Sequence, residues 1–265
     1  MDTTSILGAA LVMGSLGLVF GAVLLLANKK LAITEDPVIA AIRKSLPGAN
    51  CGACSYTGCD LFANAVAGGS AKPNACPVGG EKVTLELSEI LGVEAELVER
   101  EVAYVACGGS TRHSNFRYEY FGMDNCKAGM QLMGGGSKAC PKGCLGLGSC
   151  KGVCMFGAIE MVDGIAVIDK DKCTTCGMCV KYCPKKIIHM APYSGRATIL
   201  CHSHQSAKEV RAYCSVGCIG CKLCEKACEF GAVSTQNNLA VIDMDKCTGC
   251  NACVPKCPMK VIKPS

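Results

Sequence analysis

The chain has 265 residues, of which 24 are cysteine and none is tryptophan. Only 5% are aromatic, which argues against a large conventional core and implies that much of the stability comes from what the cysteines bind. The formal charge of +5 does not predict a nucleic-acid partner, because the basic residues form no contiguous patch.

The cysteine spacing favours metal binding over disulfides. The cysteines fall in tight runs with gaps of two or three residues, and neighbours this close rarely meet the separations and directions that a disulfide requires. Disulfide scaffolds are typical of short secreted chains, whereas clustered thiols in a longer intracellular chain usually bind metal.

Residues 1–30 are predicted to form a transmembrane anchor. Ile6 to Ala27 is a run of 22 residues without a charge, which is enough to cross about 30 Å of hydrocarbon as a helix. A cleaved signal peptide would have positive charge before this run, but Asp2 precedes it and Lys29-Lys30 follow it. The positive-inside rule therefore predicts a single-pass protein of the cell inner (cytoplasmic) membrane, with everything after residue 30 on the cytoplasmic side. Because the span contains no ionisable residue, this chain alone is not an ion pump.

Residues 31–82 are predicted to form a small iron–sulfur domain. Asp36 and Pro37 favour the start of a short helix, and Pro47-Gly48 favours its end. Four cysteines follow in the pattern C-x2-C-x4-C-x16-C-P: Cys51, Cys54, Cys59 and Cys76. This group is complete in itself, so we expect it to hold one [4Fe-4S] cluster. Zinc would be a serious rival if the group stood alone.

The rest of the chain consists of a linker region, residues 83–138, and two copies of one module at 139–195 and 196–265. The linker begins with a charged amphipathic stretch that predicts a strand and a helix. Adding 74 to the residue number maps Cys140, Cys144, Cys150, Cys154, Cys173, Cys176, Cys179 and Cys183 onto Cys214, Cys218, Cys224, Cys228, Cys247, Cys250, Cys253 and Cys257. Each copy also predicts a β-hairpin, centred on Asp163-Gly164 or Asn237-Asn238.

The repeated runs have the spacing of bacterial ferredoxins. "CTTCGMCVKYCP" and "CTGCNACVPKCP" are both C-x2-C-x2-C-x3-C-P, in which three cysteines bind one cluster and the fourth binds its neighbour. Zinc sites usually pair two C-x2-C halves across a longer spacer, which would not explain the third and fourth cysteines.

In the second module, this crossed arrangement predicts two complete ligand sets. One set is Cys218, Cys221, Cys224 and Cys257, and the other is Cys228, Cys247, Cys250 and Cys253. Five clusters along the chain would contribute a charge of about −10 and bring the formal +5 to about −5.

The first module is irregular, because Leu147 stands where the repeat places Cys221. The nearest replacement thiol is Cys140. The predicted sets are therefore Cys140, Cys144, Cys150 and Cys183 for one cluster, and Cys154, Cys173, Cys176 and Cys179 for the other. A three-iron cluster that lacks one ligand is the alternative. The cysteines left over are Cys107, Cys126, Cys201 and Cys214, which either form a sixth ligand set or are ordinary buried thiols.

These motifs predict an α+β chain: one N-terminal transmembrane helix, a four-cysteine iron–sulfur domain and tandem bacterial ferredoxin-like modules. In this order the chain resembles the B subunits of the Rnf complex, in their longer form with two ferredoxin modules. The resemblance covers essentially the whole chain. Three positions depart from the family pattern, namely Leu147, Met155 and Glu229.

The resemblance implies the electron-transfer subunit of a membrane complex that oxidises reduced ferredoxin, reduces NAD+ and translocates Na+ or H+. Flavin and nicotinamide are then expected in other subunits, and this chain has no G-x-G-x-x-G after a strand and no P-loop. The alternatives are a membrane-tethered polyferredoxin that serves a redox regulator or a biosynthetic enzyme without ion pumping, and a structural zinc protein. We expect electrons to enter at the second module and to leave near Cys51.

Overall fold

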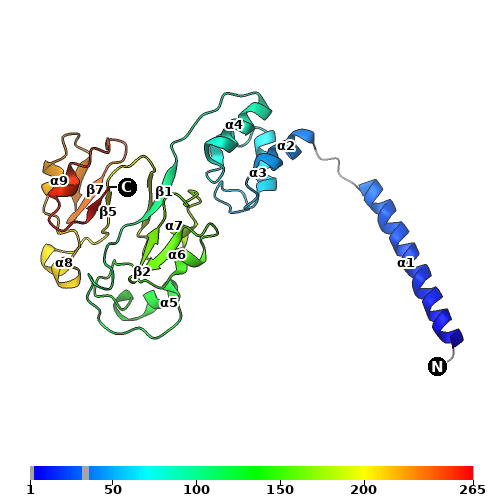
Figure 1. Cartoon of the computed structure of the whole chain (residues 1–265), viewed down its shortest axis with the longest axis horizontal. Helices are drawn as coiled ribbons and strands as arrows, with labels where there is room; N and C mark the ends of the chain where they lie inside the picture. The colour runs from blue at the N-terminus through cyan, green and yellow to red at the C-terminus, as the bar shows by residue number, and fades with distance from the viewer. Residues whose placement is uncertain (1–2, 32–35, 265) are drawn as a thin grey trace.

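The computed structural model describes residues 3–31 and 36–264, and its first element is a long apolar helix (Figure 1). Helix α1 (Thr3–Leu31) contains a stretch from Leu11 to Lys30 with a mean hydropathy of 2.1 and no buried residue. Leu18 in its middle is 78% exposed. At about 1.5 Å per residue, this helix is long enough to cross the hydrocarbon of a bilayer. The predicted N-terminal apolar helix is therefore confirmed.

The first cysteine group lies in a small helical unit with its own core. Its elements are α2 (Pro37–Ser45), α3 (Cys59–Ala67), the 3-10 turn η1 (Pro73–Ala75) and α4 (Gly80–Leu91). Helix α2 begins where the sequence predicts, because the backbone N–H of Val38 donates to Asp36 Oδ1 at 2.9 Å. Leu87 of α4 is completely buried beside Ile42 and Phe62. The unit therefore extends to Leu91, past the boundary at residue 82 that the sequence predicts.

The first module is built on two antiparallel strand pairs. Strand β1 (Glu101–Val105) pairs with β4 (Ile188–Pro192), and β2 (Ile159–Val162) pairs with β3 (Ile165–Ile168). The helical segments are α5 (Cys126–Gln131), η2 (Met133–Gly135), α6 (Ser149–Gly152) and α7 (Met178–Tyr182). Because β1 and α5 both lie within residues 83–138, the predicted linker contributes a strand and a helix to this module.

The second module repeats this plan. Strand β5 (Thr198–Ile199) pairs with β8 (Ile262–Lys263), and β6 (Val233–Gln236) pairs with β7 (Leu239–Ile242). Its helices are α8 (Ala207–Tyr213), α9 (Leu223–Lys226) and α10 (Cys253–Lys256). The turns between β2 and β3 and between β6 and β7 fall at the predicted positions, so both hairpins are confirmed. The mixed helix and strand architecture agrees with the predicted α+β class.

The segment that follows β1 holds the two modules together. Ala106 N donates to Ile187 O of the first module at 2.7 Å, and Gly108 N donates to Leu200 O of the second module at 2.9 Å. Farther along, Asn115 N donates to Tyr213 O at 2.8 Å. These backbone bonds place the first module beside the second (Figure 1).

A glycine packs against the central hairpin in each module. Gly146 has φ +78°, and a Cβ atom added there would lie 2.5 Å from the carbonyl oxygen of Gly164 in the β2–β3 turn. Gly220, its equivalent in the second module, has φ +64° and the same close approach to Asn238. Only glycine satisfies both the left-handed conformation and the close contact.

We expect Gly146→Ala to destabilise the first module, because the left-handed conformation alone costs a non-glycine residue about 1–3 kcal/mol. The midpoint of thermal unfolding of the cluster-loaded chain should fall by several degrees, at about 2–4 °C per kcal/mol. Gly157→Ala is the matched control, because Gly157 is also left-handed, with φ +63°, and nothing lies within 4 Å of its added Cβ. Equal midpoints for the two variants would contradict the importance of this close contact.

Candidate iron–sulfur sites

All 24 cysteines lie in the described part of the chain, and all are free thiols. Within residues 3–31 and 36–264, no three His, Cys, Asp or Glu side chains converge closely enough to hold a single metal ion. The sulfur atoms instead gather in groups, several of which line a common cavity. The cysteines of one group line the same cavity or raise the pKa of one another's thiols.

The structure brings the first predicted set together. Burial raises the pKa of Cys76, and the thiolates of the other three cysteines, Cys54, Cys51 and Cys59, raise it further. Cys59 is the first residue of α3, and its backbone N–H donates to Asn50 Oδ1 at 2.8 Å. This bond fixes the loop that carries the earlier two cysteines.

The set around α7 is also brought together, with the membership that the ferredoxin spacing predicts. Burial raises the pKa of Cys179 to about 11, and the thiolates of Cys173, Cys176 and Cys154 add to this effect. Ala103 of β1 donates its N–H to the sulfur of Cys173 at 3.5 Å. The strand that the linker contributes therefore also supports a candidate ligand.

In the second module, one predicted set lines a common cavity, and three members of the other set act on one another. Cys228, Cys247, Cys250 and Cys253 line one cavity with an empty volume of about 330 Å³. Ala232 N donates to the sulfur of Cys228 at 3.3 Å. In the other set, burial raises the pKa of Cys224 to about 11, and the thiolates of Cys218 and Cys221 raise it further. Cys257 packs against the same core.

The irregular set of the first module has a different membership from the prediction. Four cysteines line a cavity with an empty volume of about 350 Å³: Cys126, Cys144, Cys150 and Cys183. Burial raises the pKa of Cys150 to about 12, and the thiolates of Cys144, Cys126 and Cys183 raise it further. The structure thus puts Cys126 where the sequence predicts Cys140.

Helix α5 explains how Cys126 reaches this cavity. Cys126 is the first residue of α5, which Asn125 caps, and its N–H donates to Ser149 Oγ of α6 at 2.8 Å. Leu147, which replaces the expected cysteine, packs against α5, because a Cβ at Gly129 would lie 2.5 Å from Leu147 Cδ1. The leucine thus supports the helix that supplies the thiol in its place. The offset of 75 residues between Cys126 and Cys201, close to the repeat of 74, instead pairs Cys126 with a cysteine of the other cavity, so it does not indicate this position.

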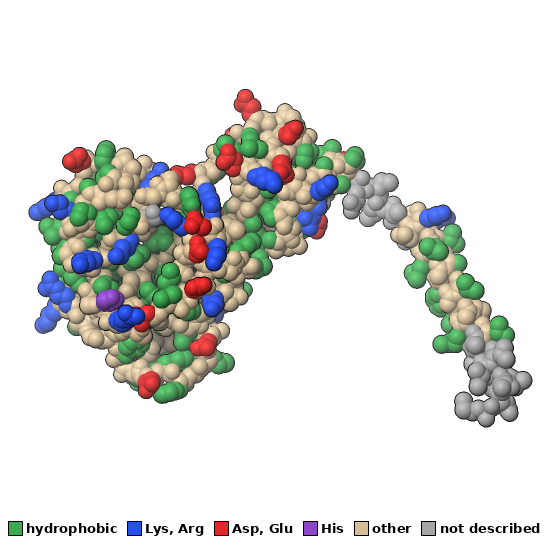
Figure 2. All heavy atoms as spheres, viewed as in Figure 1, with side chains coloured by type: hydrophobic (Ala, Val, Ile, Leu, Met, Phe, Trp, Pro, Cys, Tyr) green, Lys and Arg blue, Asp and Glu red, His purple; other side chains and the backbone are tan. Residues whose placement is uncertain are grey.

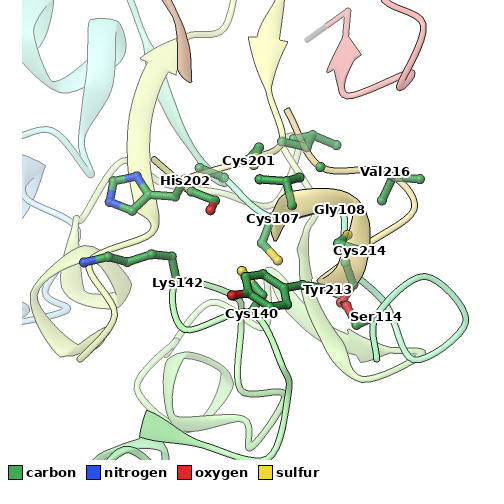
Figure 3. Close-up of a pocket in the computed structure, with 17 residues that line it drawn as sticks. Cys107, Gly108, Ser114, Cys140, Lys142, Cys201, His202, Tyr213, Cys214 and Val216 are labelled. Atoms are coloured by element: carbon green, nitrogen blue, oxygen red, sulfur yellow. The ribbon is translucent and has the colours of Figure 1, made fainter. Parts of the chain in front are cut away.

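Cys140 lies in another cavity, between the two modules (Figure 3). Four cysteines line it: Cys107, Cys140, Cys201 and Cys214. Burial raises the pKa of Cys140, and the thiolates of Cys107 and Cys214 contribute to the increase. The sixth set that the sequence suggests thus has Cys140 in place of Cys126 in the structure.

The donor sets fit [4Fe-4S] clusters. A cubane takes four thiolates, and each group supplies four sulfurs from segments separated by small residues and turns. The cavities are lined mainly by apolar residues, and backbone N–H groups donate to several sulfurs, which stabilises the thiolate form. Because burial raises the pKa of many of these thiols, binding iron must displace their protons.

Three family models match the chain. The Fe-S cluster model matches residues 46–78, the 4Fe-4S binding domain matches 166–189, and the 4Fe-4S dicluster domain matches 217–262. These ranges fall on the first cysteine group and on both modules.

Curated relatives match nearly the whole chain. It is 44% identical over 252 residues to the B subunit of the Na(+)-translocating ferredoxin:NAD(+) oxidoreductase complex of Acetobacterium woodii, covering 95% of this chain and 75% of that one. It is 42% identical over 253 residues to the B subunit of the ion-translocating oxidoreductase complex of Methanosarcina acetivorans, covering 95% of this chain and 96% of that one. It is 39% identical over 256 residues to the B subunit of the proton-translocating ferredoxin:NAD(+) oxidoreductase complex of Clostridium ljungdahlii, covering 95% of this chain and 90% of that one.

The exchange of Cys126 and Cys140 can be tested by iron counting with double variants. If Cys126 and Cys150 serve one cluster, Cys126→Ala/Cys150→Ala should lose no more iron than Cys150→Ala alone. If Cys140 holds iron in its own cavity, Cys140→Ala/Cys150→Ala should lose iron at two sites, about twice as much. The reverse pattern, with Cys140 and Cys150 non-additive, would restore the ligand set expected from the sequence.

Proposed function

The chain belongs to the family of B subunits of ion-translocating ferredoxin:NAD+ oxidoreductase (Rnf) complexes, and on this premise we propose that it carries electrons from reduced ferredoxin toward the membrane subunits. It is an iron–sulfur electron-transfer subunit of such an oxidoreductase and holds no complete active site of its own. One observation carries the proposed route. Backbone hydrogen bonds join the second module to the first, and the first cysteine set lies near Cys176 of the first module.

The site geometry supports five ligand sets. They are Cys51, Cys54, Cys59 and Cys76; Cys126, Cys144, Cys150 and Cys183; Cys154, Cys173, Cys176 and Cys179; Cys218, Cys221, Cys224 and Cys257; and Cys228, Cys247, Cys250 and Cys253. When bound, each [4Fe-4S] cluster accepts and releases one electron, at a potential that its surroundings set within about −700 to +450 mV.

The protein's own residues set these surroundings. Burial of Cys144, Cys150, Cys173 and Cys179 keeps water from the sulfurs of the first module. Backbone N–H groups such as those of Ala103 and Ala232 donate to sulfur, which favours the more negative, reduced state.

The first cysteine set lies near a cysteine of the first module. Burial raises the pKa of Cys176 in the first module, and the thiolate of Cys51 is among the charges that raise it further. The first set thus adjoins the set of Cys176. Electrons that reach the first module therefore have a short path to the unit nearest α1.

The second module is the proposed entry for electrons. Cys221 and Cys250 are the exposed cysteines of the chain, and both belong to this module. Exposed lysines accompany them, including Lys222 and Lys226. Figure 2 shows several Lys and Arg side chains on this part of the surface. Positive charge beside a solvent-near site favours the docking of an acidic ferredoxin.

Helix α1 attaches the protein to the membrane. Its apolar stretch is followed by Lys29 and Lys30, which favour the cytoplasmic side for all later residues. The proposed topology is a single pass with the iron–sulfur units in the cytoplasm, where soluble ferredoxin is available. Other subunits would then hold flavin and nicotinamide and conduct Na+ or H+. The alternative of a tethered donor without ion pumping is not favoured, because the relatives are subunits of translocating complexes.

The electron-transfer function is tested by mixing the full chain, purified from membranes without oxygen, with reduced ferredoxin. We expect the visible absorption of the clusters in the chain to bleach as ferredoxin is reoxidised. A chain with a full complement of iron that takes no electrons from ferredoxin would overturn the proposed donor. A colourless chain containing zinc would overturn the function.

Charge reversal tests the entry site. Lys222→Glu/Lys226→Glu should slow electron uptake from ferredoxin by about tenfold at low salt, with a smaller effect at high salt, because exposed charges act mainly on association. Lys151→Glu, in the equivalent helix α6 of the first module, is the matched control and should change the rate little. A larger effect from Lys151→Glu would move the entry site to the first module.

A further inference from the structure

Four cysteines outside the five sets face one cavity at the junction of the modules (Figure 3). Cys107 follows β1 and Cys140 opens the first module, whereas Cys201 follows β5 and Cys214 ends α8 of the second module. In Figure 3 the side chains of Cys107 and Cys140 point toward one another. Each module thus supplies two thiols, and the site is complete only when the modules are docked.

Backbone groups lie directly against two of these sulfurs. A Cβ added at Gly109 would clash with Ser114 Oγ at 2.6 Å and would lie in ordinary contact with Cys214 Sγ at 3.4 Å and Cys107 Sγ at 3.6 Å, so Gly109 is next to sulfurs from both modules. Cys144 donates its N–H to Cys107 Sγ at 3.3 Å. Such a bond stabilises a thiolate, which is the form that binds iron.

A buried cation lies beside the cavity. Lys138 is only 3% exposed, and its Nζ donates to the carbonyl oxygens of Gly109 and Gly164 at 2.7 and 2.8 Å. Among residues 3–31 and 36–264, no carboxylate forms an ion pair with it. A buried ammonium without a counter-charge is costly. A cubane held by four thiolates carries about −2 and would balance it.

We propose that this cavity holds a sixth [4Fe-4S] cluster, ligated by Cys107, Cys140, Cys201 and Cys214, with Lys138 as its buried counter-charge. The inference rests on the proposed electron-transfer function and supplies the connection between the modules. Cys107 adjoins the set of Cys126, Cys144, Cys150 and Cys183, because its sulfur accepts a hydrogen bond from the N–H of Cys144. Cys201 adjoins the set of Cys218, Cys221, Cys224 and Cys257, because it packs against the core cluster that contains Cys218 and Cys224. The cluster therefore lies between two sets that belong to different modules.

Iron and acid-labile sulfide per full chain, purified from membranes without oxygen, test the site. Six cubanes give about 24 irons and five give about 20. Cys201→Ala and Cys140→Ala, from opposite modules, should each fall to about 20. Ser203→Ala, a buried neighbour in the same cavity, should keep 24 and controls for disturbance of the lining.

A wild-type count of about 20 that neither cysteine variant lowers would overturn the sixth cluster and leave the proposed function intact. Near-zero iron with bound zinc would instead overturn the proposed function itself. If one variant fails to fold, the other still decides the matter, because their cysteines lie in different modules.

Lys138 has a separate readout in redox titrations followed by electron paramagnetic resonance. Lys138→Gln removes the charge but keeps donors for the two carbonyls. It should shift the midpoint of at least one signal to a lower potential, or release four irons, while Lys138→Arg stays near wild type. Unchanged midpoints at full iron content in Lys138→Gln would overturn the counter-charge role.

Discussion

Four thiolates must meet around one small volume to hold a cubane, and this requirement governs how the chain folds. Helices α6, α9 and α10 have only four residues each, and each includes a cysteine. Cysteines are also members of the buried cores of both modules. Because cysteines make up a large share of these cores, whose fully buried members include no aromatic residue, folding and cluster binding are coupled, as in other small metal-binding domains.

The same requirement explains the irregular first module. Leu147 removes one local ligand and packs against α5, and α5 presents Cys126 to the incomplete set. In the second module all the local ligands are present, so Cys201, the counterpart of Cys126, is available for the cavity between the modules. The two modules thus differ in one local ligand, Leu147 against Cys221. This difference explains both why Cys126 joins the first module's set and why Cys201 faces the cavity between the modules.

Local spacing predicts the sets that the ferredoxin runs contain, because their ligands lie within a few residues or follow a fixed pattern. It likewise predicts the hairpin at Asp163-Gly164 and the start of α2 at Asp36. It could not place Cys126, which lies 18 residues before Cys144 and reaches the cavity only because α5 packs on Leu147. The nearest thiol in sequence, Cys140, belongs to a different cavity. Long-range packing of this kind leaves no local signal.

The central claim is that the cysteine sets form one continuous series from the second module to the unit beside the anchor. A map of the intact complex, detailed enough to resolve iron, tests it most directly. We expect cubane density within each set, including the one between the modules, with Cys126 and Cys140 at the sites assigned above. Density for the other five sets with none between the modules would break the series and contradict this claim.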